Sequence, residues 1–158
     1  MKALLMLGSN MQDPKYQLEL AVQKIQSIGK VLSKSSLYKT AAWGKTNQND
    51  FMNQALVLDC NLEAEELMKA LLEIEISMGR QRISKWAERS IDIDIILYDN
   101  LIMNTDVLRV PHPHMQDRKF VLEPCAEIAG DWKHPILHFD IQELLKNCKD
   151  VLSVEKIS

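Results

Sequence analysis

The segment from Glu88 to Asp99, ERSIDIDIILYD, most limits how this chain can fold. Its apolar residues predict a buried β-strand, in which successive side chains point to opposite faces. The two faces are then occupied by Ile91, Ile93, Ile95 and Leu97 and by Asp92, Asp94, Ile96 and Tyr98. Two carboxylates on one face, with Cα atoms about 7 Å apart, repel each other and resist burial. The strand therefore predicts a cation beside Asp92 and Asp94.

The segments around this strand alternate between strand and helix patterns. Strand patterns cover residues 2–8, 30–38 and 51–60, and the aspartate strand is expected to turn at Asp99–Asn100 into another strand over 101–108. Helical patterns run from about 14 to 28 and from about 63 to 78. The order β-α-β-β-α-β predicts a ferredoxin-like α+β fold, an antiparallel sheet with helices packed on it. A C-terminal extension follows, where Asp140 and Glu143 have capping-box spacing and predict a short helix.

Length and composition limit the class of protein. The 158 residues suit one domain, and 46% hydrophobic and 26% charged residues are ordinary for a soluble globular protein. The net charge of −3 argues against a nucleic-acid-binding surface, and no apolar run approaches the roughly 18 residues of a membrane span. The N-terminus lacks a signal-peptide cleavage site, and three cysteines without CxxC spacing predict thiols in the cytoplasm. We expect a monomer.

A cluster of cations directly precedes the aspartates. Residues 79–90, GRQRISKWAERS, contain Arg80, Arg82, Lys85 and Arg89. Carboxylates suit Mg²⁺, and guanidinium groups offer phosphates rigid bidentate donors, so the combination predicts a phosphate site. Each part also has an ordinary interpretation. The acids could lie on a solvent-facing strand edge, and Arg89 could form a weak surface ion pair with Glu88.

Two further segments carry candidate binding residues. Phe51 and Trp43 in residues 40–53, TAAWGKTNQNDFMN, could stack on a flat ligand together with Trp86 of the cationic segment. Alternatively, Phe51 could belong to the core and the tryptophans could be surface anchors. Asn53 shares a strand face with Phe51, and an amide on an apolar face needs a partner, which favours a ligand.

The segment VPHPHMQDRKFVLEP, residues 110–124, contains His112 and His114 two residues apart. His-x-His could bind zinc and support a hydrolase, but the prolines predict an irregular segment, and a polyphosphate-binding loop with His112 and Arg118 as donors is favoured. Glu75 lies on the predicted second helix beside its apolar stripe. It is either a surface acid or a partner of a ribose or an arginine.

Three blocks of the sequence occur together in one known family. SLYKTAAWG…NDFMNQAL, GRQR…KWAERSIDIDIILYDN and VPHPHMQDRKFVLEP, with the initial LGSN, resemble the 6-hydroxymethyl-7,8-dihydropterin pyrophosphokinase family over essentially the whole chain. The resemblance implies a ferredoxin-like fold and a single pyrophosphokinase domain over residues 1–158. It implies transfer of pyrophosphate from ATP to the hydroxymethyl group of the reduced pterin, with release of AMP, in folate biosynthesis. The alternative is a catalytically silent pterin- or nucleotide-binding module.

The resemblance also implies roles for residues at matching positions. Asp92 and Asp94 would hold two Mg²⁺ ions that bridge the ATP phosphates. The catalytic cations would be Arg80, Arg82 and Arg89. The nucleotide site would further include Glu75, Lys85, Ile95, Arg109, His112 and Arg118. The pterin slot would be formed by Thr40, Ala41, Trp43, Phe51, Asn53, Trp86 and Phe120. Loops 40–50 and 79–89 resemble the family's mobile lids.

Overall fold

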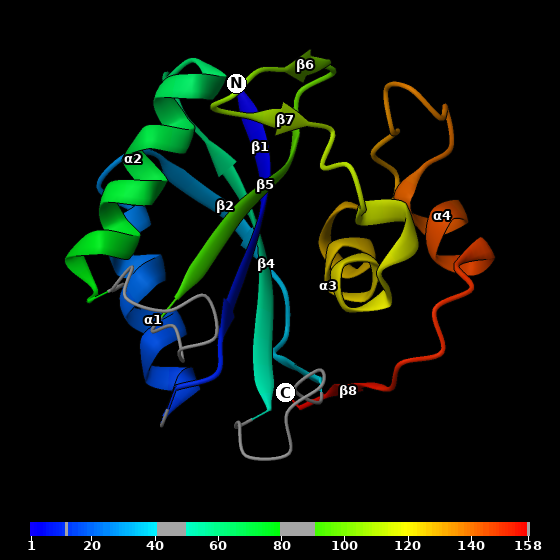
Figure 1. Cartoon of the computed structure of the whole chain (residues 1–158), viewed down its shortest axis with the longest axis horizontal. Coiled ribbons are helices and arrows are strands. Elements are labelled where there is room, and N and C mark those ends of the chain that lie inside the picture. The colour runs from blue at the N-terminus through cyan, green and yellow to red at the C-terminus, as the bar shows by residue number, and fades with distance from the viewer. Residues whose placement is uncertain (12, 41–49, 80–90, 158) are drawn as a thin grey trace.

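Within residues 1–11, 13–40, 50–79 and 91–157, which the computed structural model describes, a six-stranded sheet lies between two layers of helices (Figure 1). Its strands are β1 (Lys2–Ser9), β2 (Lys30–Lys34), β3 (Tyr38–Thr40), β4 (Phe51–Asp59), β5 (Asp92–Tyr98) and β8 (Val154–Lys156). The order is β5-β1-β4-β3-β8, β2 also pairs with β4, and these pairings are antiparallel. The predicted ferredoxin-like α+β fold is confirmed.

Helices cover both faces of the sheet. Helices α1 (Pro14–Ile25) and α2 (Ala64–Ser77) lie on one face, and α3 (Lys119–Ala129) and α4 (Ile141–Asn147) lie on the other (Figure 1). Leu5 and Leu7 of β1 belong to the core beneath α1 and α2, whereas Leu4 and Met6 belong to the core beneath α3. A strand buried on both faces needs a continuous apolar run, which explains the sequence KALLMLG.

The helix ends follow their local sequence signals. Asp13 Oδ1 accepts a hydrogen bond from Tyr16 N at the start of α1, 3.3 Å away. Asp140 and Glu143 form the predicted capping box of α4, with Glu143 N donating to Asp140 Oδ1 over 2.8 Å. Gly79 follows α2 with φ of 93°, a left-handed conformation that glycine adopts without strain.

Four parts of the chain differ from the predictions. The expected strand over 30–38 is divided into β2 and β3. The expected strand over 101–108 is wrong, because a two-residue strand β6 (Met103–Asn104) pairs with β7 (Arg109–Val110) rather than with β5. The sequence prediction also missed α3 and β8. The segment after Pro111 and Pro113 enters a short 3₁₀-helix, Met115–Asp117, and then α3.

The alternation of side chains along β5 holds only over its first part. Ile91, Ile93 and Ile95 belong to the core beneath α1 and α2, as predicted, and Asp92 and Asp94 are on the other face. Leu97 and Tyr98 lie on the faces opposite to those predicted. The cause is a register shift against β1, where Leu4 pairs with Leu97 but Leu5 pairs with Ile95.

Candidate active site

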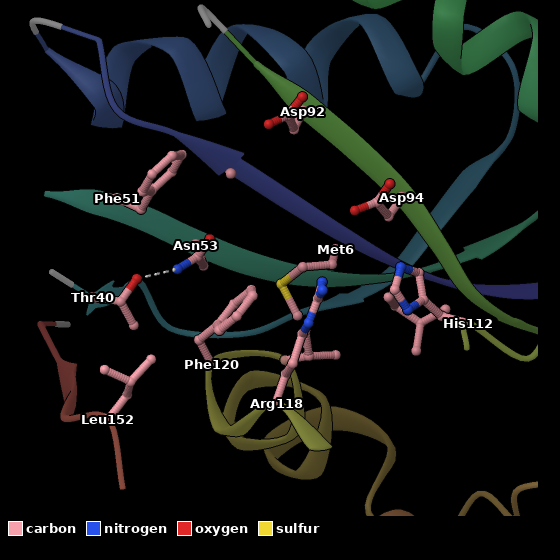
Figure 2. A pocket seen from close by; sticks show the side chains of 13 residues that line it. Met6, Thr40, Phe51, Asn53, Asp92, Asp94, His112, Arg118, Phe120 and Leu152 are labelled. Carbon is pink, nitrogen blue, oxygen red and sulfur yellow. Dashed lines mark hydrogen bonds between the residues drawn. The ribbon is translucent and has the colours of Figure 1, made fainter. Parts of the chain in front are cut away.

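A pocket of about 290 Å³ lies between the sheet and the start of α3 (Figure 2). Strands β1, β4 and β5 form its floor, and residues just before and within α3 face them. The pocket is lined by Met6, Gly8, Thr40, Phe51, Asn53, Asp92, Asp94, Ile96, His112, Arg118, Phe120, Val121 and Leu152. It therefore joins residues that are far apart in the sequence.

The predicted acidic pair is part of this pocket. Asp92 and Asp94 project from β5 on the side of α3 (Figure 2), with Asp92 half-buried and Asp94 exposed. On β1, Gly8 is opposite Asp92 and Met6 is opposite Asp94. The pair is thus fixed on a strand whose other face is buried in the core, which holds its orientation.

Glu75 supports the same strand from the opposite side. Its side chain is 3% exposed, so it is not the surface acid that its position on α2 allowed. Glu75 Oε1 accepts a hydrogen bond of 2.6 Å from Ile93 N, on the edge of β5 that does not face β1. The carboxylate therefore satisfies a backbone donor between the two aspartates. Glu75 does not line the pocket.

The opposite end of the pocket carries an ordered amide. Asn53 is 4% exposed, and its Nδ2 donates to Thr40 Oγ1 over 3.2 Å, as drawn in Figure 2. Phe51 lies on the same strand and also lines the pocket, so both residues share the predicted face. A hydrogen-bonding amide beside an aromatic ring can bind the polar edge of a flat heterocycle.

Arg118 and Phe120 enter the pocket from the side of α3 (Figure 2). Arg118 is the residue before α3, and its guanidinium carbon lies 5.9 Å from the centre of the Phe120 ring. This cation–π contact keeps a positive charge beside the aromatic surface. Phe51 on β4 and Phe120 on α3 thus provide rings from opposite sides of the pocket.

His112 is held in a neutral form with a defined tautomer. Its backbone N donates to Ile96 O over 2.9 Å, which ties the residue to β5. Burial, with Arg118 and His114 nearby, lowers the pKa of His112 from 6.5 to about 4. His112 Nδ1 accepts from His114 N over 3.2 Å, so the proton of the neutral ring is on Nε2. His112 is therefore a hydrogen-bond donor through Nε2.

Besides Glu75, two further residues predicted for the nucleotide site lie outside the pocket. The Ile95 side chain is buried beneath α1 and α2 because it alternates with Asp94, and Ile96 lines the pocket in its place. Arg109 is exposed on β7 and does not line the pocket. The other candidates lie outside the described residues: Ala41, Trp43, Arg80, Arg82, Lys85, Trp86 and Arg89. The same is true of most of the two expected lids.

Sequence reasoning missed several pocket residues, namely Met6, Gly8, Ile96, Val121 and Leu152. The motif LGSN contained a signal for Gly8, because a glycine at the end of an apolar strand indicates a close approach of another group. The alternation of β5 places Ile96 on the face of the aspartates. Nothing in the sequence pattern indicated Leu152.

The donors present suit magnesium better than zinc. Asp92 and Asp94 offer hard oxygen ligands at one end of the pocket, and its volume of about 290 Å³ leaves room for water and phosphate, as Mg²⁺ requires. Among the described residues, no group of three or more His, Cys, Asp and Glu side chains is placed to hold a metal ion. The zinc interpretation of His112 and His114 therefore lacks a third ligand among the described residues.

None of the helices in the described part of the chain is long and apolar enough to cross a membrane.

The fold and the pocket define a ferredoxin-like α+β protein with a small-molecule site on the α3 side of its sheet. A model of the 7,8-dihydro-6-hydroxymethylpterin-pyrophosphokinase (HPPK) family matches residues 4–130. The 2-amino-4-hydroxy-6-hydroxymethyldihydropteridine pyrophosphokinase of Aquifex aeolicus is 35% identical over 137 residues, which cover 87% of this chain and 86% of the relative. The enzyme of that name from Haemophilus influenzae is 36% identical over 150 residues, 94% of this chain and 93% of the relative. The chain belongs to the HPPK family.

Solved structures support the fold. The Plasmodium falciparum HPPK-DHPS crystallised with pteroate superposes with a TM-score of 0.74 at 16% sequence identity. The match covers 92% of this chain but only 44% of that longer chain. At this identity the likeness establishes the shared fold.

Proposed function

We propose that this chain catalyses its family's reaction, the transfer of a pyrophosphoryl group from ATP to the hydroxymethyl group of 6-hydroxymethyl-7,8-dihydropterin, in folate biosynthesis. One observation carries the proposal. A single pocket contains the carboxylates of Asp92 and Asp94 and, at its other end, the Asn53–Thr40 pair beside Phe51. Such a pocket can bind a heterocycle next to the phosphates of a second substrate.

The pterin binds at the amide end. Its flat ring fits between Phe51 and Phe120, and its polar edge meets Asn53. Thr40 orients the Asn53 amide, since the Nδ2–Oγ1 hydrogen bond places Asn53 Nδ2 toward Thr40. The hydroxymethyl group then points along the pocket toward β5.

The ATP phosphates bind at the acidic end. Two Mg²⁺ ions bound to Asp92 and Asp94 would offset the phosphate charge and lower the pKa of the pterin hydroxyl. Arg118 donates hydrogen bonds from its guanidinium to the phosphate oxygens, and His112 donates to them from Nε2. Arg80, Arg82, Lys85 and Arg89 are expected to add positive charge from residues 80–89, and Trp43, Trp86 and Ala41 to complete the pterin slot.

The reaction then follows from charge and position. The pterin hydroxyl oxygen forms a bond to the β-phosphorus as the bond from that phosphorus to the AMP oxygen breaks, and the hydroxyl proton passes to water. The donors of Arg118 and His112 stabilise the charge that builds up on the phosphoryl oxygens. No described side chain is needed as a strong base, because Mg²⁺ held by Asp92 and Asp94 would make the pterin hydroxyl more acidic.

The proposal extends to the state of the protein. We expect residues 1–158 to act as one pyrophosphokinase domain and as a monomer, without nucleic acid or a membrane partner. Cys60, Cys125 and Cys148 are free thiols, which agrees with the reducing cytoplasm as its compartment.

Product analysis tests the function. The purified chain is incubated with ATP, Mg²⁺ and 6-hydroxymethyl-7,8-dihydropterin, and the phosphorus products are followed by ³¹P NMR. We expect AMP and the pterin pyrophosphate in equal amounts, and no AMP without the pterin. ADP as the product would contradict the proposal. Pterin binding without any turnover would instead favour the silent binding module.

A further inference from the structure

The C-terminal segment, residues 149–157, passes from α4 back to the sheet (Figure 1). Its β8 strand pairs with β3, so that Val154 lies opposite Thr40. Leu152, two residues before Val154, lines the pocket at the same end as Thr40 and Asn53 (Figure 2). The family model ends at residue 130, so this wall comes from a part of the chain that the model does not match.

Leu152 lies between two hollows. A second, outer hollow of about 600 Å³ is lined by Asp117, Arg118, Phe120, Lys149, Asp150 and Leu152. Arg118, Phe120 and Leu152 line both hollows and therefore lie between them. Of these three, Leu152 is the aliphatic side chain at the amide end. Shortening it would open the pterin end toward the outer hollow.

Asp150 holds Leu152 in place. Asp150 Oδ1 accepts from Leu152 N over 2.9 Å, and Oδ2 accepts from Lys119 N over 3.0 Å, in the first turn of α3. One carboxylate thus ties the C-terminal segment to the helix that carries Phe120. These two backbone donors lower the pKa of Asp150, so the carboxylate is ionised at neutral pH and its hydrogen bonds are charge-assisted.

The far end of the segment is also anchored. Ile157 N donates to Leu37 O over 2.8 Å, and Lys156 Nζ lies 3.7 Å from Glu127 Oε1 on α3. Glu127 in turn accepts from the Tyr38 hydroxyl over 2.6 Å. Leu152 is therefore part of a segment fixed on both sides rather than a freely moving tail residue.

We propose that Leu152 is a specificity-determining residue that limits the size of the pterin ring substituents the pocket accepts, with Asp150 as its positioning residue. The inference rests on the proposed binding of the pterin between Phe51 and Phe120. A leucine at this boundary excludes groups that would extend into the outer hollow, whereas alanine would admit them. The difference in size between a leucine and an alanine side chain in an apolar pocket changes the selectivity between ligands by about tenfold or more.

A comparison of the binding of an unsubstituted pterin with that of larger analogues tests the proposal. The probes are 6-hydroxymethyl-7,8-dihydropterin and its analogues with a propyl group at C7 or at N8, each titrated into the full chain by calorimetry. For Leu152→Ala we expect the preference for the unsubstituted pterin over at least one propyl analogue to fall by about tenfold or more. The affinity for a non-hydrolysable ATP analogue with Mg²⁺ stays within about twofold, because the acidic end is unchanged.

Three further variants separate selectivity from general damage. Val151→Ala, at the neighbouring residue that is 95% exposed, leaves the preference unchanged. Asp150→Ala reproduces the shift of Leu152→Ala. The double variant shows no larger shift than Leu152→Ala alone, because both changes act on the same wall.

The outcomes distinguish this inference from the proposed function. The role of Leu152 is overturned if Leu152→Ala keeps the wild-type preference, or if it loses affinity equally for all the pterins. The proposed function still stands in that case, provided that the wild-type chain binds the unsubstituted pterin. Failure of the wild-type chain to bind the unsubstituted pterin overturns both.

Discussion

Gly8 of β1 and Asn53 of β4 are opposite each other in the sheet, and a Cβ atom on residue 8 would lie only 2.8 Å from Asn53 Oδ1. Side-chain carbons essentially never come so close to another heavy atom, so the Asn53 amide can occupy its position only because residue 8 is glycine. Gly8 also pairs with Asp92 on its other side. This one glycine therefore lies in the sheet between Asn53 at one end of the pocket and Asp92 at the other.

We expect Gly8→Ala to weaken pterin binding by about tenfold or more, because the added methyl displaces an amide whose hydrogen bonds are worth about 1–3 kcal/mol. Asn53→Ala should cause a similar loss. Titration calorimetry with the pterin measures both. In the double variant the losses should not add, since the displaced group is already absent. Fully additive losses would show that Gly8 acts independently of Asn53.

We expect Glu75→Ala to lower the free energy of unfolding by about 1–3 kcal/mol, because it leaves Ile93 N without its carboxylate partner in a buried position. Glu75→Gln keeps an acceptor oxygen and should be milder. Urea denaturation gives both values, and Glu73→Ala, at an exposed position of the same helix, is the control. Equal stability of the Glu75→Ala and Glu73→Ala variants would refute a structural role for the buried carboxylate.

The low pKa of His112 predicts a specific dependence of stability on pH. Between pH 6.5 and about 4 the unfolded chain binds a proton at this imidazole that the folded chain does not, so the free energy of unfolding falls as the pH falls through this range. His112→Gln should flatten this slope. Denaturation at several pH values measures it, with exposed His138→Asn as the control. If the free energy of unfolding of His112→Gln changed with pH as steeply as that of the wild type, the assigned burial of His112 would be contradicted.

The features predicted correctly from the sequence are those set by local rules. The shared face of Asp92 and Asp94 follows from the alternation of a strand, and the α4 cap follows from the spacing of Asp140 and Glu143. The ferredoxin-like order follows from the sequence of strand and helix patterns. Each of these depends on patterns within short segments or on the order of such segments along the chain.

The features that were missed depend on distant partners. The exchange of Leu97 and Tyr98 arises where β5 shifts its register against β1, which no pattern within β5 contains. The burial of Glu75 depends on Ile93, 18 residues later. Leu152 reaches the pocket because β8 pairs with a three-residue strand more than a hundred positions earlier. Single-sequence patterns carry little information on such long-range pairings.

The central claim is that Asp92 and Asp94 hold the metal ions that position ATP beside the pterin. Its most direct test is the rate of pterin-dependent AMP formation by Asp92→Asn and Asp94→Asn, with exposed Asp106→Asn as the matched control. Asparagine is nearly isosteric but lacks the charge that Mg²⁺ requires, so we expect each rate to fall by about a thousandfold or more while the fold is retained. A rate near that of the wild type in either variant would contradict the account.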